Sequence, residues 1–105
     1  MDRTLRTLYN AEAEQAVIGA MLIDPRCIPA VVSELKPEEI SSDTYRQVYD
    51  IIVGMFNRSE AVDAVMVAEA AQRAGIENAE RIITGMVSTM PSVNNVGGYV
   101  QIVRD

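Results

Sequence analysis

Apolar residues recur along most of this chain at a spacing of three or four positions, which is the period of an α-helix. No segment shows the sustained alternation of apolar and polar residues that indicates a half-buried β-strand. The pattern therefore predicts an all-α fold, a compact irregular or orthogonal bundle of about six helices. These helices are expected over roughly residues 11–23, 27–35, 43–56, 64–74, 78–88 and 92–103.

Short-range signals define both ends of the first helix. Asn10 can accept a hydrogen bond from the free amides of a first turn, and the charges of Glu12 and Glu14 are favoured there by the helix dipole. Asp24-Pro25 ends the helix, because proline disfavours helical geometry in the residue before it. Residues 1–9 show no sustained period, so we expect a flexible N-terminal arm followed by one domain over residues 10–105.

The third and fourth helices also have clear boundaries. Ser42-Asp43 offers a cap for the third helix. Asp63 is placed to cap the fourth, with Val62 and Val67 at the positions of a hydrophobic staple, and Gly75 ends it. The apolar face of the third helix is predicted to lie in the core. Its residues are Tyr45, Val48, Tyr49, Ile52 and Phe56.

The last helix contains Gly97-Gly98, which weakens it by about 2 kcal/mol relative to two alanines. Packing against the rest of the fold must therefore hold it. An apolar stripe runs almost to the last residue, where little chain is left to cover it, so core and protein interface both remain open interpretations. The candidate interface residues are Tyr99, Val100, Ile102 and Val103.

At 105 residues and 49% hydrophobic, the chain is long enough for a single core without disulfides or metals. Its one cysteine, Cys27, cannot form an internal disulfide and is expected to be a small buried residue. The longest apolar run, Ala16 to Ile23, is far shorter than the ~20 residues of a membrane-spanning helix, and no signal-peptide pattern is present. We therefore expect a soluble, cytoplasmic protein without a membrane partner.

The formal net charge of -6 argues against strong direct DNA binding, which needs clustered cations that release counterions from phosphates. Arg3 and Arg6 form the only close pair of cations, so a nucleic-acid-binding tail is the alternative to keep open. The acidic surface suits a basic protein partner or serves solubility alone. A helical DNA-binding regulator would need several groove-reading side chains on one helix, and the fourth helix offers only Gln72 and Arg73 near its end.

The residues of common catalytic sites are missing from the sequence. There is no phosphate-binding loop of the G-x-x-x-x-G-K-[ST] type, no histidine, and one cysteine. We therefore expect no ATP hydrolysis, no metal site and no cofactor in this chain. The carboxylate pairs Glu12/Glu14 and Glu38-Glu39 lack a basic partner and are interpreted as dipole-favoured or solvated groups.

Tyr45 and Tyr49 lie one helical turn apart and could form an aromatic platform for a base or a partner's helix. Core packing with Phe56 is the simpler interpretation, since the same face carries aliphatic residues. The candidate partner surface consists of Glu12, Glu14 and Tyr45.

Three blocks of sequence carry a family resemblance. The string E-A-E-Q-x-V-x-G-x-M-L-x-D, from Glu12 to Asp24, closely resembles the first helix of the N-terminal domain of DnaB-type replicative DNA helicases. Val62-Asp63, followed by Val67 and Glu69, resembles the turn into a later helix of that domain. The C-terminal block resembles the family's P-S-x-x-N-x-x-x-Y-x-x-I-V-R ending. It comprises Pro91-Ser92, Asn95, Tyr99 and Ile102-Val103-Arg104.

The chain also departs from the family pattern. Leu8-Tyr9 stands where members usually have proline, a cluster near residues 40–45 is only partly kept, and the link from Gly75 to Pro91 is a few residues short. In the family the domain continues into a helical hairpin, a linker and a RecA-like ATPase domain, and none of these follows Asp105. The chain is therefore interpreted as an excised N-terminal module.

The resemblance implies a non-catalytic collar domain that supports assembly of a hexameric helicase ring and recruits primase during DNA replication. Its implied partners are other helicase subunits, primase and a helicase loader. ATP and Mg²⁺ are implied only for the missing motor domain. A free-standing phage or plasmid adaptor that mimics the helicase collar is the alternative function.

Overall fold

The computed structural model describes the backbone of residues 3–88 and 93–104, with side chains for 10–88 and 94–104. Within these residues the chain forms six α-helices and three short 3₁₀ helices, with no strand, so the predicted all-α class is confirmed. The α-helices are α1 (Arg3–Ile23), α2 (Ile28–Glu34), α3 (Asp43–Asn57), α4 (Ala64–Arg73), α5 (Ala79–Ser88) and α6 (Val96–Arg104). The 3₁₀ helices are η1 (Pro25–Cys27), η2 (Pro37–Glu39) and η3 (Val93–Asn95).

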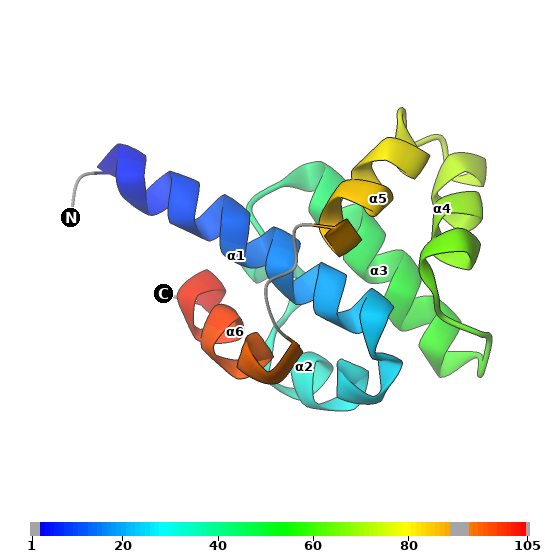
Figure 1. The fold of residues 1–105 in the computed structure, drawn as a ribbon, viewed down its shortest axis with the longest axis horizontal. Helices are drawn as coiled ribbons and strands as arrows, with labels where there is room; N and C mark the ends of the chain where they lie inside the picture. Colours follow the sequence, from blue (N-terminus) through cyan, green and yellow to red (C-terminus); the bar gives the residue numbers. More distant parts are fainter. Residues whose placement is uncertain (1–2, 89–92, 105) are drawn as a thin grey trace.

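α1 is the central element of the fold and packs against α6, α5 and α3. Its residues Val17, Ile18 and Met21 are completely buried, at the helical spacing that places them on one face. Figure 1 shows α3, α4 and α5 forming the half of the molecule away from the two chain ends, with α6 lying beside α1. One core therefore joins all six helices.

The predicted start of the first helix is wrong. α1 begins at Arg3, so Asn10 lies inside the helix rather than capping it, and residues 3–9 are helical rather than an irregular arm. No glycine or proline interrupts residues 3–18, and extending an existing helix by one residue is far easier than nucleating a new one. An interior asparagine costs at most about 0.7 kcal/mol relative to alanine, which does not stop that extension.

The predicted signals around α3 and α4 are confirmed. The Ser42 hydroxyl accepts a hydrogen bond from the Tyr45 amide at 3.2 Å, and the Asp63 carboxylate accepts one from the Met66 amide at 2.8 Å. Gly75 has φ +88°, and its amide donates to the Gln72 carbonyl at 3.1 Å. These bonds satisfy backbone groups that a helix end leaves without partners.

Two details of the predicted core and last helix differ. Phe56 is exposed, and Met55 fills the core position instead; both lie one turn after Ile52, and the sequence spacing alone does not choose between them. Gly97-Gly98 falls in the first turn of α6, while Val100 and Val103 hold the rest of that helix against the core. Pro91-Ser92, where this helix was expected to start, lie outside the described residues.

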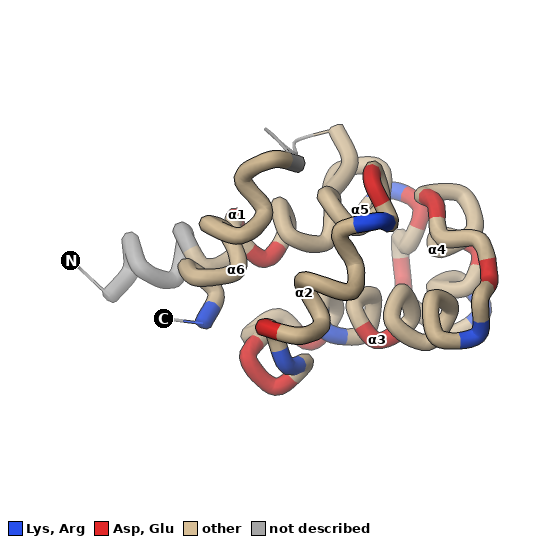
Figure 2. Tube along the Cα trace, turned by 90° about the horizontal axis from the view of Figure 1, so that it is seen from below, with Lys and Arg blue, Asp and Glu red and all other residues tan. Residues whose placement is uncertain are grey.

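Charged residues are spread over the described surface rather than gathered by sign. Figure 2 shows Asp and Glu on most of the helices, with Lys and Arg between them. Five of the six arginines with described side chains form an ion pair with a carboxylate, and Arg81 is the exception. No single described helix is long and apolar enough to cross a membrane; residues 10–23 and 25–34 pass that test only as a pair bent by 115°.

Candidate functional site

The predicted C-terminal interface is partly internal to the domain. Val100 is 1% exposed and Val103 is 6% exposed, because α6 packs against α1 and α2. Of the two interpretations that the sequence left open, core is therefore the correct one for Val100 and Val103. Tyr99 is half-buried against the core and Ile102 is 42% exposed, so these two remain candidates for an interface.

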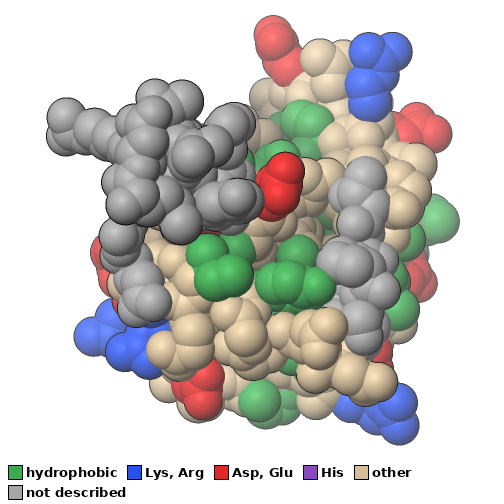
Figure 3. Space-filling view, turned by 60° about the vertical axis from the view of Figure 1, so that its left-hand side comes forward, with side chains coloured by type: hydrophobic (Ala, Val, Ile, Leu, Met, Phe, Trp, Pro, Cys, Tyr) green, Lys and Arg blue, Asp and Glu red, His purple; other side chains and the backbone are tan. Residues whose placement is uncertain are grey.

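On the side of the molecule near the two chain ends, the surface formed by the described residues is not broadly apolar. In the part of this face that the described residues form, Figure 3 shows a few hydrophobic side chains interrupted by backbone, polar groups and a carboxylate. Scattered hydrophobic groups of this kind are normal for a protein surface. An interface through Tyr99 and Ile102 stays a prediction.

Glu14, one of the three residues of the predicted partner surface, lies inside the protein. It is 2% exposed, and its carboxylate accepts hydrogen bonds from the Ser41 amide at 2.9 Å, the Ser41 hydroxyl at 2.6 Å and the Ser42 amide at 3.2 Å. Its assignment to a solvated partner surface is therefore wrong. Glu12 is exposed, as a partner surface requires, and Tyr45 is only half-buried.

The sequence contained a signal for this burial. Glu14 precedes Val17, Ile18 and Met21 by three, four and seven positions, which puts it on the same helix face as these core residues. Its partners, Ser41 and Ser42, immediately precede α3, and the positive end of the α3 dipole favours a carboxylate there. Glu14 therefore fastens α1 to the start of α3.

The predicted aromatic platform is not formed by two free rings. Tyr49 is buried, and its hydroxyl donates to the Leu35 carbonyl at 2.6 Å. Burial, together with the nearby charges of Asp50 and Glu39, raises the pKa of Tyr49 to about 12. The core interpretation is confirmed for Tyr49, while Tyr45 packs against the edge of the core.

Cys27 is only partly buried, rather than fully buried as predicted. Desolvation is the main cause that raises the pKa of its thiol, and the charge of Asp24 acts in the same direction. A thiol with a raised pKa is a poor nucleophile, because the thiolate is the reactive form. Among the described residues, no group of three or more His, Cys, Asp and Glu side chains is placed to hold a metal ion.

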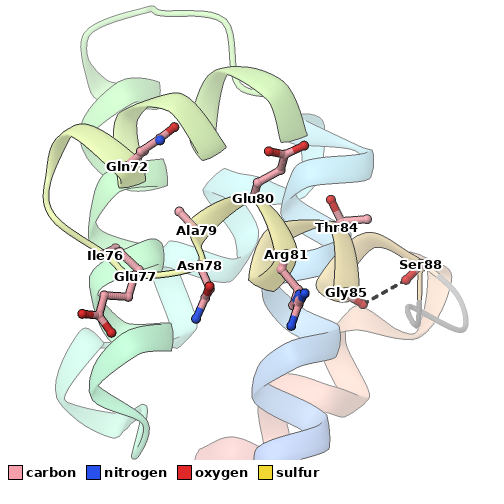
Figure 4. Close-up of a pocket in the computed structure, with 10 residues that line it drawn as sticks. All are labelled: Gln72, Ile76, Glu77, Asn78, Ala79, Glu80, Arg81, Thr84, Gly85 and Ser88. Carbon is pink, nitrogen blue, oxygen red and sulfur yellow. Dashed lines mark hydrogen bonds between the residues drawn. The ribbon is translucent and has the colours of Figure 1, made fainter.

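A surface groove lies between α4 and α5 in the described part of the chain. One hollow of about 810 Å³ lies along α5 and the turn before it, and a second of about 340 Å³ lies between α4 and α5. Gln72, Glu80 and Thr84 line both hollows, so the two lie next to each other. Figure 4 shows the larger hollow with Gln72, Ile76, Glu77, Asn78, Ala79, Glu80, Arg81, Thr84, Gly85 and Ser88.

The lining of this groove is acidic overall. It contains the carboxylates of Glu69, Glu77 and Glu80 and one cation, Arg81. Arg73, which is not part of the lining, bonds to Glu69 at 2.6 Å; Glu77 and Glu80 have no ion-pair partner among the described residues. Sequence reasoning missed this site because its residues come from two helices and carry no motif.

The structure thus defines an all-α domain with an acidic groove and a buried carboxylate that joins two helices. The family model for the DnaB-like helicase N terminal domain matches residues 6–105, and the chain belongs to this family. The resemblance inferred from the three sequence blocks is confirmed.

Two replicative DNA helicases are similar to this chain in sequence. The chain is 35% identical over 97 residues to the replicative DNA helicase DnaB of Mycobacterium leprae (strain TN), covering 89% of this chain and 16% of that protein. It is 33% identical to the replicative DNA helicase DnaB of Rhodothermus marinus, covering 90% of this chain and 10% of that protein. The chain thus spans less than a fifth of the length of these two relatives.

A solved structure of a helicase N-terminal domain has the same fold as this chain. The N-terminal domain of DnaB helicase from Mycobacterium tuberculosis matches with a TM-score of 0.84 and 33% sequence identity, covering 90% of this chain and 70% of that chain. The helical arrangement described above is therefore that of a helicase N-terminal domain.

Proposed function

We propose that this chain acts as the non-catalytic N-terminal domain of a replicative DNA helicase, supporting ring assembly and recruiting primase during DNA replication. The observation that carries the proposal is the family match over residues 6–105, in a chain whose length is only a small part of its helicase relatives. A domain of this kind contributes contacts between proteins rather than chemistry.

The composition of the chain supports the non-catalytic part of this proposal. The sequence has neither a phosphate-binding loop nor a histidine to move protons. ATP and Mg²⁺ would bind in a motor domain elsewhere in the full helicase, which would work in the cytoplasm. This domain would not hold DNA strongly, since its net charge is -6 and most described arginines already pair with carboxylates.

Its partners would be other helicase subunits, arranged as dimer pairs within a hexamer, together with primase and a helicase loader. Half-buried Tyr99 and exposed Ile102 are candidates for contacts between subunits, and the α4–α5 groove is a candidate for recruited partners. These two surfaces involve different helices, so assembly and recruitment can be tested by separate variants.

A titration of the chain with the cognate primase, followed by calorimetry and light scattering, tests the recruitment function. We expect a defined complex and no ATP turnover above a protein-free control. Failure to bind primase would overturn recruitment. ATP turnover that is lost on mutation of a residue in this chain would overturn the non-catalytic function.

A further inference from the structure

We propose that the α4–α5 groove binds a basic amphipathic helix of a partner protein. This inference rests on the proposed function, because it identifies the kind of segment that a recruited partner would present.

The shape of the groove fits a helix. Its α4 wall consists of Ala64, Val65, Ala68, Glu69 and Gln72, which recur at the spacing of one helix face. α4 has ten residues and is therefore about 15 Å long, enough to contact about three turns of a partner helix. Alanines, with Thr84 and Gly85 opposite, leave room for a helix to approach closely.

The groove also provides apolar contact. Val65 is 75% exposed, the most exposed of the large hydrophobic residues with described side chains, and Met66 next to it is 42% exposed. α4 is held in the fold by Val67 and Ala71, which are completely buried, so Val65 is not needed to attach the helix. Val65 therefore offers apolar surface that the side chains of a partner helix would bury.

The charges of the rim favour a basic occupant. Glu69, Glu77 and Glu80 outnumber Arg81, and Figure 4 shows Glu80 on the α4 side of α5, while Glu77 and Arg81 are both directed away from α4. The chain's net charge of -6 attracts a cationic partner before contact is made. Lysines and arginines on the flanks of a helix could then pair with the rim while its apolar face covers Val65.

Other occupants match the groove less well. A nucleic acid would be repelled by the three carboxylates. A second copy of this chain is itself acidic, and five of its six described arginines are already paired. An extended peptide adds to an open sheet edge, whereas both walls here are helices whose backbone groups bond internally.

Synthetic peptides give a direct test. The probe is a peptide of about five helical turns with leucine and alanine on one face and arginine and lysine beside it. Two control peptides carry either glutamate at every basic position or the same residues in scrambled order. Amide chemical shifts of the labelled chain and fluorescence anisotropy of the peptide measure binding.

We expect the probe alone to bind, with the largest shift changes in residues 64–72 and 77–88. The double variant Glu77→Lys, Glu80→Lys should weaken binding at least about tenfold, and Val65→Ser should weaken it severalfold. The matched control is Glu34→Lys, Glu38→Lys, which makes the same change in net charge at exposed residues of α2 and η2 and should leave affinity within about twofold.

Several results would overturn the proposal: no binding of the probe, equal binding of the scrambled peptide, shift changes centred elsewhere, or equal weakening in the Glu34, Glu38 control. The outcome is separable from that of the proposed function. Peptide binding without primase binding would reject recruitment of primase but keep the groove assignment. Primase binding without peptide binding would reject the groove assignment but keep the recruitment of primase.

Discussion

Two regions of this domain use glutamates in opposite ways. At the α1–α3 junction, Glu14 is buried and accepts three hydrogen bonds from Ser41 and Ser42. In the α4–α5 groove, Glu77 and Glu80 are exposed and have no ion-pair partner among the described residues. Burial and nearby donors, rather than residue type, thus distinguish a carboxylate that is bonded within the fold from carboxylates that stay exposed at the surface.

The largest expected effect comes from removing the buried carboxylate. Glu14→Ala should lower the free energy of unfolding by about 3 kcal/mol, because it removes the charged acceptor of three hydrogen bonds from two amides and a hydroxyl. Urea unfolding at neutral pH measures this. Glu12→Ala, an exposed residue of the same helix, is the control and should change stability by less than about 0.5 kcal/mol. If Glu14→Ala and Glu12→Ala changed the free energy of unfolding equally, the contrast between buried and exposed carboxylates would be refuted.

The second prediction concerns another buried polar group, Tyr49, and its pH dependence. Its pKa is raised from 10.0 to about 12 in the folded state, so the folded protein holds this proton more tightly than the unfolded chain. The resulting stability is fully present below about pH 10 and is lost as pH rises toward 12, by roughly 2 kcal/mol.

The comparison of parent with Tyr49→Phe isolates this effect from other titrating groups. At neutral pH the parent should be more stable by about 1 kcal/mol through the bond to Leu35, and this advantage should shrink or reverse above pH 10. A difference that stays constant across the alkaline range would contradict the raised pKa.

A smaller effect is expected at the start of α4, where a carboxylate is exposed but still has a structural partner. Asp63→Ala should cost about 1 kcal/mol, since it removes the acceptor for the Met66 amide. Asp50→Ala, at an exposed position within α3, is the matched control and should be nearly neutral. Thermal melts that coincide for parent and Asp63→Ala would show that the cap does not stabilise this helix.

The smallest effect is expected in the groove itself. Glu77→Gln, Glu80→Gln removes two charges that have no ion-pair partner among the described residues, so stability should change by less than about 0.5 kcal/mol. Chemical denaturation measures this, and peptide binding should weaken in the same variant. A loss of stability comparable to that of Glu14→Ala would mean that these carboxylates serve the fold.

Local sequence was sufficient for features that depend on neighbouring residues. Ser42 and Asp63 cap helices through hydrogen bonds to amides three positions ahead, and Gly75 ends α4 through its own backbone conformation. Helical spacing likewise identified most of the core of α3, and three sequence blocks identified the family. The caps, the helix end and the core spacing depend on residues within one or two helical turns of each other. The family resemblance depends only on the order of residues along the chain.

Tertiary structure decided which residues of an amphipathic helix are covered, and by what. Glu14 is buried because Ser41 and Ser42, 27 and 28 positions away, supply its donors. Val100 and Val103 became core rather than interface because α6 packs against α1, and the groove exists because α4 and α5 stand side by side. Sequence periodicity determines which residues share a face, but burial depends on contacts between segments far apart in the chain, which only the folded arrangement specifies.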